Sequence, residues 1–248
     1  MRLIGQTVLV TGATSGIGLA LSEQLLARGN TVLACGRNRQ ALMKLEESYP
    51  NNVHSYAGDL SMPGQADKMA EAIADKHQLS VLVNNAGVQH LVDFTNSPYT
   101  HTRDKTIEEL QINQAVPILL TARLLPVLAK QPQAAIVNIT SGLALAPKKS
   151  APVYCATKAA MRAFTKSLRY QLCDSGSNIR LHEALPPLVD TPMTQGRGSG
   201  KITPQAAARA IIAGIENDAE EIYIGKSQLL RVVHRLAPGI AERILRNW

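Results

Sequence analysis

Tyr154 and Lys158 stand four residues apart in the run Tyr154-Cys155-Ala156-Thr157-Lys158. Residues with this spacing share a face of a helix, so the lysine ammonium can stand near the phenol and favour its ionised form. Such a tyrosine can act as a general acid or base on a substrate oxygen. The spacing alone is weak evidence, because it arises by chance in many chains of this length. The polar residues and glycines that accompany the pair therefore decide whether it is catalytic.

Two polar residues accompany the Tyr-Lys pair. Ser141 lies thirteen residues before Tyr154, at the predicted end of a strand. Its hydroxyl can hold a substrate carbonyl there and stabilise the oxygen on which negative charge grows. Asn113 lies in a predicted long helix that also contains Pro117. Either residue alone has a ready structural explanation, whereas all four together predict a catalytic set.

A glycine turn, Thr11-Gly12-Ala13-Thr14-Ser15-Gly16-Ile17-Gly18, follows a predicted strand and opens a predicted helix. Backbone N–H groups and the helix dipole can hold a pyrophosphate at such a place, and glycine leaves room for its approach. The spacing differs by one residue from the usual dinucleotide fingerprint. A plain strand-to-helix turn is the alternative. The predicted dinucleotide contacts are Gly12, Thr14, Ser15, Gly16, Ile17 and Gly18.

The end of the second predicted strand reads Cys35-Gly36-Arg37-Asn38-Arg39, with no acidic residue. Enzymes that use NAD place a carboxylate here for the ribose 2′-hydroxyl, whereas a 2′-phosphate needs a cation. Arg37 offers a planar fork of donors, with Arg39 as a second cation, so NADP is favoured over NAD. Both arginines could instead be solvated helix-start residues. Asp59-Leu60 could bind the adenine amine, or Asp59 could be a simple helix cap.

Together these residues resemble the short-chain dehydrogenases/reductases, over essentially the whole chain. The resemblance implies an oxidoreductase that transfers a hydride between nicotinamide and a carbonyl or alcohol substrate, and with Arg37 its cofactor would be NADP(H). Asn113, Ser141, Tyr154 and Lys158 would be its catalytic tetrad, with Tyr154 and Lys158 also contacting the cofactor. A local distortion at Asn113 would let its carbonyl hold a water that links Lys158 to solvent. The run Asn84-Asn85-Ala86-Gly87 would steady the sheet, with Asn85, Ala86 and Gly87 lining the adenosine pocket.

The chain departs from the family after the sixth predicted strand, where it reads Pro186-Pro187-Leu188-Val189-Asp190-Thr191 instead of Pro-Gly followed by threonine. Pro187 removes a backbone donor and fixes φ, so the carboxamide would be held by the Val189 backbone and Thr191. This run, the block from Pro152 to Lys158 and the basic tail look closest to a bacterial subgroup associated with teichoic-acid D-alanylation. That resemblance implies no particular substrate.

Short apolar runs rich in β-branched residues alternate with longer amphipathic stretches, which predicts an α/β fold: a Rossmann-like, doubly wound, three-layer sandwich around a seven-stranded parallel sheet. The predicted strands are Thr7–Val10, Thr31–Ala34, His54–Ala57, Val81–Val83, Ala135–Ile139, Ile179–Glu183 and Ile222–Ile224. The predicted helices are Ile17–Arg28, Gln40–Ser48, Gln65–Lys76, Thr106–Leu128, Val153–Leu172 and Pro204–Glu216. The catalytic and cofactor motifs fall mostly at strand ends, where ligands bind such sheets.

Length and composition suit one domain over residues 1–248. Three scattered cysteines form neither a disulfide framework nor a zinc motif, so we expect a reducing compartment and no metal. No signal-peptide pattern and no run of roughly 18 apolar residues occurs, which predicts a cytoplasmic protein without a membrane span. The net charge of +7 suits an anionic partner, but aromatic residues make up only 4% and no basic stripe interleaves with them, which argues against nucleic acid.

The tail from Lys226 to Trp248 has five basic residues and one acidic residue, and its apolar residues recur at helical spacing. Pro238-Gly239 should break it into two short helices. Such a tail can lie on an anionic membrane, but more often it docks on its own domain or on another subunit. The family resemblance implies a homodimer or homotetramer built on the helices Thr106–Leu128 and Val153–Leu172.

The substrate side is less legible, because its loops vary freely on a fixed scaffold. Predicted walls are residues 142–152, the turn Gln89-His90-Leu91 and the glycine-rich loop from Pro192 to Thr203, a candidate lid. The cations Lys148, Lys149, Arg197 and Lys201 could pair with an anionic substrate group or could simply be solvated. Cys155 is interpreted as packing. An NADP-binding sensor or scaffold with little turnover, possibly at the membrane, is the alternative function.

Overall fold

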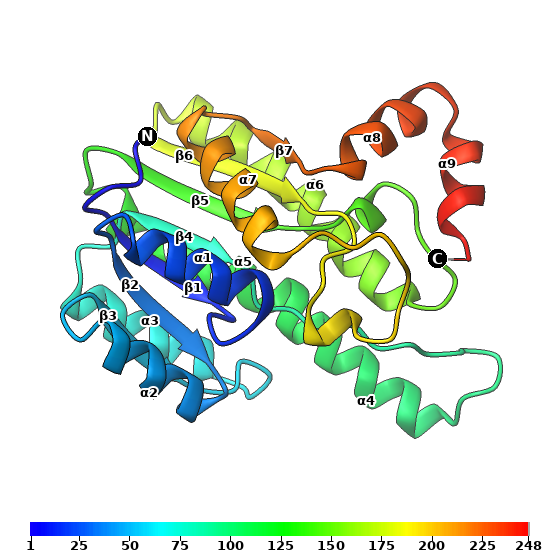
Figure 1. Ribbon diagram of the computed structural model, residues 1–248, viewed down its shortest axis with the longest axis horizontal. Coiled ribbons are helices and arrows are strands. Elements are labelled where there is room, and N and C mark those ends of the chain that lie inside the picture. The colour runs from blue at the N-terminus through cyan, green and yellow to red at the C-terminus, as the bar shows by residue number, and fades with distance from the viewer. Residues whose placement is uncertain (248) are drawn as a thin grey trace.

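Seven short apolar segments form one parallel sheet in the computed structural model, which describes residues 1–247 (Figure 1). The strand order is β3-β2-β1-β4-β5-β6-β7. The order therefore reverses between β1 and β4, and the carboxyl ends of these strands form a crevice suited to a ligand. The strands are β1 (Thr7–Thr11), β2 (Thr31–Gly36), β3 (Val53–Ala57), β4 (Val81–Asn84), β5 (Ala134–Ile139), β6 (Ile179–Leu185) and β7 (Glu221–Tyr223).

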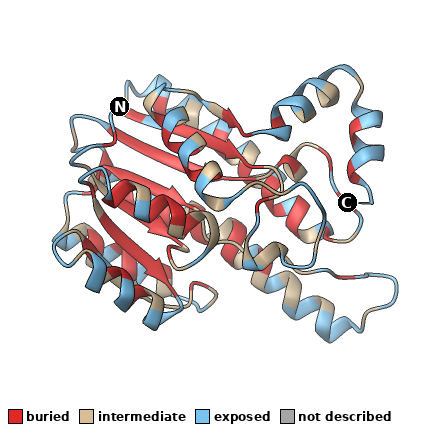
Figure 2. Cartoon of the chain, in the orientation of Figure 1, coloured by how far each residue is buried: buried red, intermediate tan, exposed pale blue. Residues whose placement is uncertain are grey.

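Helices cover both faces of the sheet, whose strands are largely buried (Figure 2). Side chains alternate between the two faces of a strand. In β1, Val8 and Val10 accordingly pack in the core beneath α1 (Gly16–Leu26), α2 (Arg39–Ser48) and α7 (Pro204–Glu216). Leu9 packs on the opposite side with α3 (Gln65–Lys76), α5 (Val116–Leu128) and α6 (Pro152–Asp174). The predicted doubly wound α/β fold is confirmed.

The predicted strands are confirmed to within two residues at each end, but one predicted helix is wrong as a continuous α-helix. Instead of Thr106–Leu128, the chain forms α4 (Tyr99–Leu110), a π-helical turn over Gln111–Ala115 and then α5. Residues 99–105, in the first half of α4, show no apolar periodicity, and the buried residue of α4 is Glu109. The missing periodicity explains why the first half of α4 was not predicted.

The π-helical turn has a cause in the sequence. An α-helix pairs the N–H of residue i with the carbonyl of residue i−4, so the partner of the Asn113 carbonyl would be the N–H of Pro117, which does not exist. The N–H of Val116 instead donates to the Gln111 carbonyl, five residues back. This leaves the Asn113 carbonyl without an N–H from residue 117, as the expected distortion requires.

The tail forms two short helices, α8 (Lys226–Leu236) and α9 (Pro238–Leu245), at the upper right of Figure 1. The break falls at Ala237, whose backbone is not helical (φ −148°, ψ 70°) because the following proline disfavours helical geometry there; Pro238 itself begins α9. Ala241 and Leu245 pack against Ala146, so the tail docks on its own chain. No helix among residues 1–247 is long and apolar enough to cross a membrane.

Candidate active site

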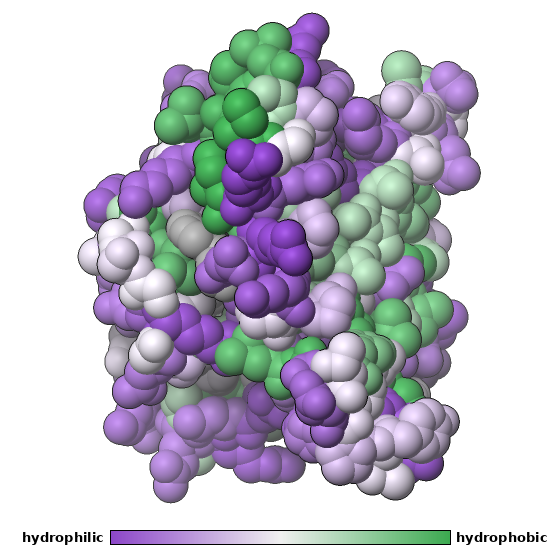
Figure 3. Space-filling model, turned by 90° about the vertical axis from the view of Figure 1, so that its right-hand side faces the viewer, coloured by the Kyte–Doolittle hydropathy of each residue, from purple (hydrophilic) through white to green (hydrophobic). Residues whose placement is uncertain are grey.

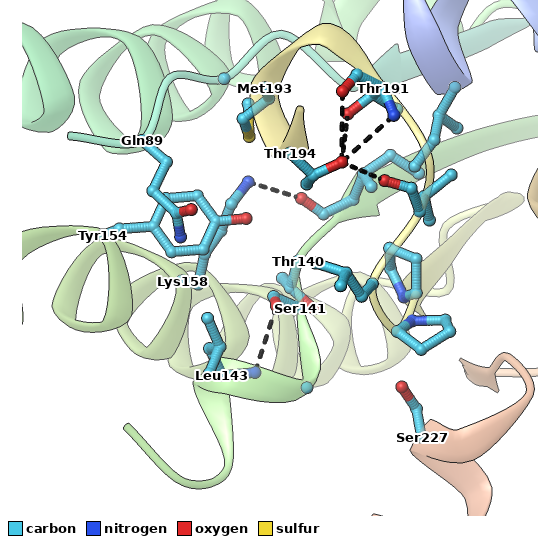
Figure 4. A pocket seen from close by; sticks show the side chains of 18 of the residues that line it. Gln89, Thr140, Ser141, Leu143, Tyr154, Lys158, Thr191, Met193, Thr194 and Ser227 are labelled. Carbon is cyan, nitrogen blue, oxygen red and sulfur yellow. Dashed lines mark hydrogen bonds between the residues drawn. The ribbon is translucent and has the colours of Figure 1, made fainter. Parts of the chain in front are cut away.

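A cavity of about 480 Å³ opens at the carboxyl ends of β1, β4, β5 and β6. Figure 4 shows Tyr154, Lys158 and Ser141 among the side chains that line it. A catalytic set and a dinucleotide turn predicted from distant parts of the chain therefore share one hollow. From the predicted set the cavity brings together Gly12, Ser15, Gly16, Ile17, Asn85, Ala86, Gly87, Ser141, Tyr154, Lys158, Val189 and Thr191.

The turn between β1 and α1 is too closely packed to admit side chains. Gly12 and Gly16 have φ values of +69° and +53°, and a Cβ placed at Gly18 would lie 2.1 Å from the Gly12 carbonyl oxygen. Asn85 Nδ2 donates to the Thr11 carbonyl over 2.9 Å and fixes the turn to β4. Ser15 makes no side-chain cap for α1. The first N–H groups of α1 are thus left for a ligand, and the turn fits a pyrophosphate.

Tyr154 and Lys158 are both buried on α6, at 8% and 6% exposure. The Lys158 ammonium lies 5.6 Å from the centre of the Tyr154 ring and donates to the Ile139 carbonyl over 2.8 Å. Burial raises the pKa of Tyr154 to about 12, and the nearby Ser141 hydroxyl acts in the opposite direction. Burial lowers the pKa of Lys158 to about 8. The phenol is therefore protonated at neutral pH, beside a lysine whose ammonium loses its proton more readily than that of an exposed lysine.

Asn113 is held beside this pair by its side chain. Its Oδ1 accepts from the Val88 N–H, and its Nδ2 donates to the Val88 carbonyl, each over 2.8 Å. A Cβ built on Gly87 would lie 3.2 Å from Asn113 Oδ1 and 3.7 Å from Lys158 Nζ, so all three residues meet. Asn113 itself is 1% exposed. Its side chain ties the loop after β4 to the π-helical turn.

Ser141 directly follows Thr140 at the end of β5, where the loop leaves the sheet. Its Oγ accepts the N–H of Leu143 over 3.1 Å, which caps the short 3₁₀ turn Gly142–Ala144. Because this bond uses a lone pair of the hydroxyl, the Ser141 proton remains free to be donated. The hydroxyl can therefore bind a carbonyl oxygen inside the cavity, next to Tyr154.

Five predicted cofactor residues lie outside the cavity lining around Tyr154: Thr14, Gly18, Arg37, Asp59 and Leu60. Arg37 and Asp59 stand at the ends of β2 and β3, with 3.9 Å between Arg37 Nη1 and Asp59 Oδ2. Asp59 also caps Ser61, whose backbone N–H is the main group that lowers the pKa of the carboxyl. The Leu60 side chain is buried in the core, and Thr14 packs against Gly36. Arg37 is largely exposed and free to meet a phosphate.

Two threonines, Thr191 and Thr194, hold the loop after β6 beside the glycine turn. A Cβ on Gly16 would lie 2.9 Å from Thr191 Cγ2, so this threonine packs directly on the glycine turn. Thr194 Oγ1 donates to the Val189 carbonyl over 2.5 Å and accepts the Thr191 N–H over 3.2 Å (Figure 4). Pro187 lines the cavity. The loop is therefore ordered by threonine side chains, and Pro187 stands where the family pattern has a glycine.

Comparison with known proteins decides the family. The pattern of the short chain dehydrogenase family matches residues 6–201. The chain is a short-chain dehydrogenase/reductase. It is 41% identical over 196 residues to the uncharacterized oxidoreductase DltE of Bacillus subtilis (strain 168), covering 79% of this chain and 76% of DltE. This match confirms the resemblance to the D-alanylation-associated subgroup.

Solved structures of the family agree with the fold. A short chain dehydrogenase from Burkholderia cenocepacia J2315, in complex with NADP, is similar with a TM-score of 0.86 and 26% identity over 99% of both chains. A short chain dehydrogenase/reductase from Burkholderia phymatum, in complex with NAD, reaches a TM-score of 0.85 at 21% identity over 100% of this chain and 97% of the other. Both cofactors therefore occur among proteins of this architecture.

The family match ends at residue 201, yet this short-chain dehydrogenase/reductase extends its cavity wall beyond it. Side chains of α8 and α9 line the cavity, which the sequence did not predict: Lys226, Ser227, Leu229, Leu230, Val233, Ile244 and Leu245. The signal was present as an apolar face at helical spacing, interpreted as a docking surface alone. Gln89, Leu143 and Lys148 from the predicted walls also line the cavity. Cys155 is buried, with a pKa raised by burial, consistent with packing.

Proposed function

We propose that this protein is an NADP(H)-dependent reductase of carbonyl compounds, reversible as an alcohol dehydrogenase. The observation that carries the proposal is the meeting of Tyr154, Lys158 and Ser141 with the glycine turn around one cavity. A bound nicotinamide supplies or accepts the hydride at the substrate carbon. The chain itself has only to hold both reactants and to manage a proton.

The residues divide the remaining chemistry of reduction. Ser141 donates a hydrogen bond to the carbonyl oxygen and stabilises the negative charge that grows on it as the hydride arrives. Tyr154 then transfers its phenolic proton to this oxygen, so the C=O group becomes C–OH. The phenolate regains a proton from Lys158, which is restored from solvent by way of the Asn113 carbonyl. Oxidation of an alcohol runs through the same steps in reverse.

NADP rather than NAD is the proposed cofactor. Its support is Arg37, which stands at the end of β2 with its guanidinium exposed and only a long 3.9 Å contact to Asp59. The adjacent Asn38 uses its side-chain oxygen to cap α2. A 2′-phosphate would gain charge-assisted bonds from the guanidinium, which a 2′-hydroxyl cannot match.

We also propose a homodimer or homotetramer built on α4, α5 and α6. Large apolar side chains on these helices face solvent in the single chain: Tyr99, Ile107, Leu110, Leu119 and Tyr170 are each at least 42% exposed. Burying apolar area of this kind is the usual drive for association. Light scattering on the purified protein gives its mass directly.

The experiment that tests the reductase is a titration with NADPH and NADH, followed by cofactor consumption against ketones, aldehydes, quinones and keto sugars. We expect tight NADPH binding and turnover of at least one compound. Tyr154→Phe should lower kcat by about 10²–10⁴-fold, since it removes the general acid, and should bind NADPH nearly as wild type does. Tyr170→Phe, an exposed tyrosine on the same helix, is the matched control. Ordinary turnover by Tyr154→Phe contradicts the proposed acid.

A further inference from the structure

Two cations from different loops converge on one neutral acceptor at the cavity. Arg197, in the loop after β6, donates from Nη1 to Gln89 Oε1 over 2.6 Å. Lys148, in the loop after β5, brings its Nζ within 3.5 Å of the same oxygen. Gln89 lies in the loop after β4, and both Gln89 and Lys148 line the cavity that holds Tyr154. Three loops therefore bring two positive charges together beside the proposed reaction centre.

These charges are sheltered from water and have no acidic partner. Lys148 is only 9% exposed, and Arg197 is half-buried in a loop whose neighbouring residues are exposed. Among residues 1–247 no carboxylate lies within salt-bridge distance of either cation, whereas nearby Lys201 pairs with Asp190. Glu109, buried below the loop after β4, accepts the His90 N–H instead. Burial and the charge of Arg197 lower the pKa of Lys148. Sheltered charges of like sign are costly unless an anion joins them.

The backbone holds both residues in place. The Lys148 N–H donates to Cys155 Sγ over 3.4 Å, and the next N–H, of Lys149, donates to the Arg246 carbonyl in the tail over 3.0 Å. The Arg197 N–H donates to the Thr194 carbonyl over 3.0 Å. Both cations thus stand on turns tied to α6, to the tail and to the 3₁₀ turn Pro192–Thr194. A ligand would meet a pair already assembled.

We propose that Lys148 and Arg197, joined at Gln89, form an anion-binding subsite for the carbonyl substrate. The substrate class is then an oxo compound that carries a carboxylate or a phosphate and an aliphatic body. The body fits because Leu143, Leu230, Val233 and Leu245 line the same cavity. The anion takes the place of Gln89 Oε1 as the acceptor of both cations. The inference rests on the proposed reductase function, because it assigns the substrate of that site.

Binding tests the subsite without any turnover. Octanoate and octyl phosphate serve as unreactive probes, with 1-octanol as the neutral probe, and calorimetry is run in saturating NADP⁺ so that the cofactor site is filled. We expect at least one anion to bind at least tenfold more tightly than octanol. Lys148→Met and Arg197→Gln should each lose about tenfold in that affinity. The exposed Lys149→Met and Arg209→Gln are matched controls that should lose nothing. Equal binding of both anions and octanol, or equal loss in the controls, overturns the subsite.

Turnover separates the subsite from the reductase itself. The paired substrates are 4-oxooctanoate with its methyl ester, and dihydroxyacetone phosphate with dihydroxyacetone, which distinguish a carboxylate from a phosphate. The anionic member of a pair should have the higher kcat/KM by at least tenfold, and Lys148→Met or Arg197→Gln should remove that preference. Gln89→Glu places a carboxylate between the cations and should also remove it. Equal rates on acid and ester would leave the reductase standing and overturn the subsite. Anion binding that depends on Lys148, with no reduction of any compound, would support the subsite and contradict the reductase.

Arg197→Gln guards against a folding artefact. Arg197 lies in a loop, and the residues next to it in the sequence are exposed. Loss of its guanidinium should therefore leave the thermal midpoint of unfolding within a few degrees of wild type. If Lys148→Met unfolds, the Arg197 variant therefore still decides between the two outcomes. A stably folded Arg197→Gln protein with undiminished anion preference overturns the subsite.

Discussion

Burial moves the pKa values of Tyr154 and Lys158 apart, the phenol upward and the ammonium downward, whereas the sequence predicted that Lys158 would favour the ionised phenol. Water is excluded from both groups, so each neutral form is favoured: the pKa of the phenol rises to about 12 and that of the ammonium falls to about 8. These two residues could be predicted from the sequence because a tyrosine and a lysine four residues apart are visible in it. Lys148 and Arg197 could not be separated from solvated surface cations in the same way, since their convergence on Gln89 depends on three loops meeting.

The buried ammonium of Lys158 should make stability depend on pH. Its folded pKa of about 8 lies below the ordinary 10.5, so between these values the unfolded chain binds more protons and stability rises with pH. The full rise attributable to Lys158 is about 3 kcal/mol. Urea denaturation at pH 7.5, 8.5 and 9.5 should show this rise in wild type and its loss in Lys158→Met. Subtracting the two curves cancels the contribution of Tyr154. Parallel curves for the two proteins would show that burial does not disfavour the charged form of Lys158.

Arg37 should determine which cofactor is preferred. Loss of charge-assisted bonds to a phosphate costs about 1.5–3 kcal/mol, so Arg37→Ala should weaken NADPH binding by about 10- to 100-fold and leave NADH binding unchanged. Fluorescence titration with each cofactor measures both affinities. Arg39→Ala, two residues along, reveals whether the second cation contributes, and Arg209→Ala is a control of equal charge on α7. An unchanged NADPH preference in Arg37→Ala would assign the 2′-phosphate to another cation.

At the scale of elements, apolar patterns succeed where the helix or strand has a buried face and fail where it has none. The strands and α1, α2, α3 and α7 were predicted to within two residues or so, because the core selects their side chains. The first half of α4 buries no side chain in the core, so its sequence has no apolar periodicity from which to predict a helix. The π-helical turn is a third case: its cause, Pro117, is visible in the sequence, but the response of the helix is a matter of backbone geometry.

Pro117 should matter to catalysis through the carbonyl of Asn113. Pro117→Ala restores an N–H four residues after Asn113 and allows an ordinary α-helical bond, which would occupy the carbonyl proposed to relay protons. We expect kcat to fall several-fold with little change in the KM for NADPH, and the unfolding midpoint to stay or rise. Steady-state kinetics across pH 6–9 measures this. Pro126→Ala, at an exposed proline inside α5, is the matched control. Full activity in Pro117→Ala would remove the carbonyl from the relay.

At the scale of the whole molecule, the tail has two different surfaces. One surface packs Ala241 and Leu245 on Ala146 and lines the cavity. The other leaves Val232, Leu236 and Ile240 at 51% exposure or more, whereas Leu229 and Ile244 line the cavity although they are also more than half exposed. Figure 3 shows hydrophobic side chains gathered at the top of this side of the molecule, where Figure 1 places α8 and α9. The sequence alternatives of docking on the chain and lying on a membrane therefore concern different faces of the same helices.

Detaching the tail should weaken substrate binding and leave cofactor binding unchanged, because the tail lines the part of the cavity that lies away from the glycine turn. Ala241 is fully buried against Ala146, so Ala241→Asp places an unpaired charge in that contact. The KM for the carbonyl substrate should rise at least tenfold while the Kd for NADPH stays within twofold. Leu236→Asp adds the same charge to the same helices at a side chain 78% exposed and should change neither constant. It should, however, abolish sedimentation with anionic vesicles if the outer face binds membranes. A tail that only covers the surface would leave the substrate KM unchanged in both variants.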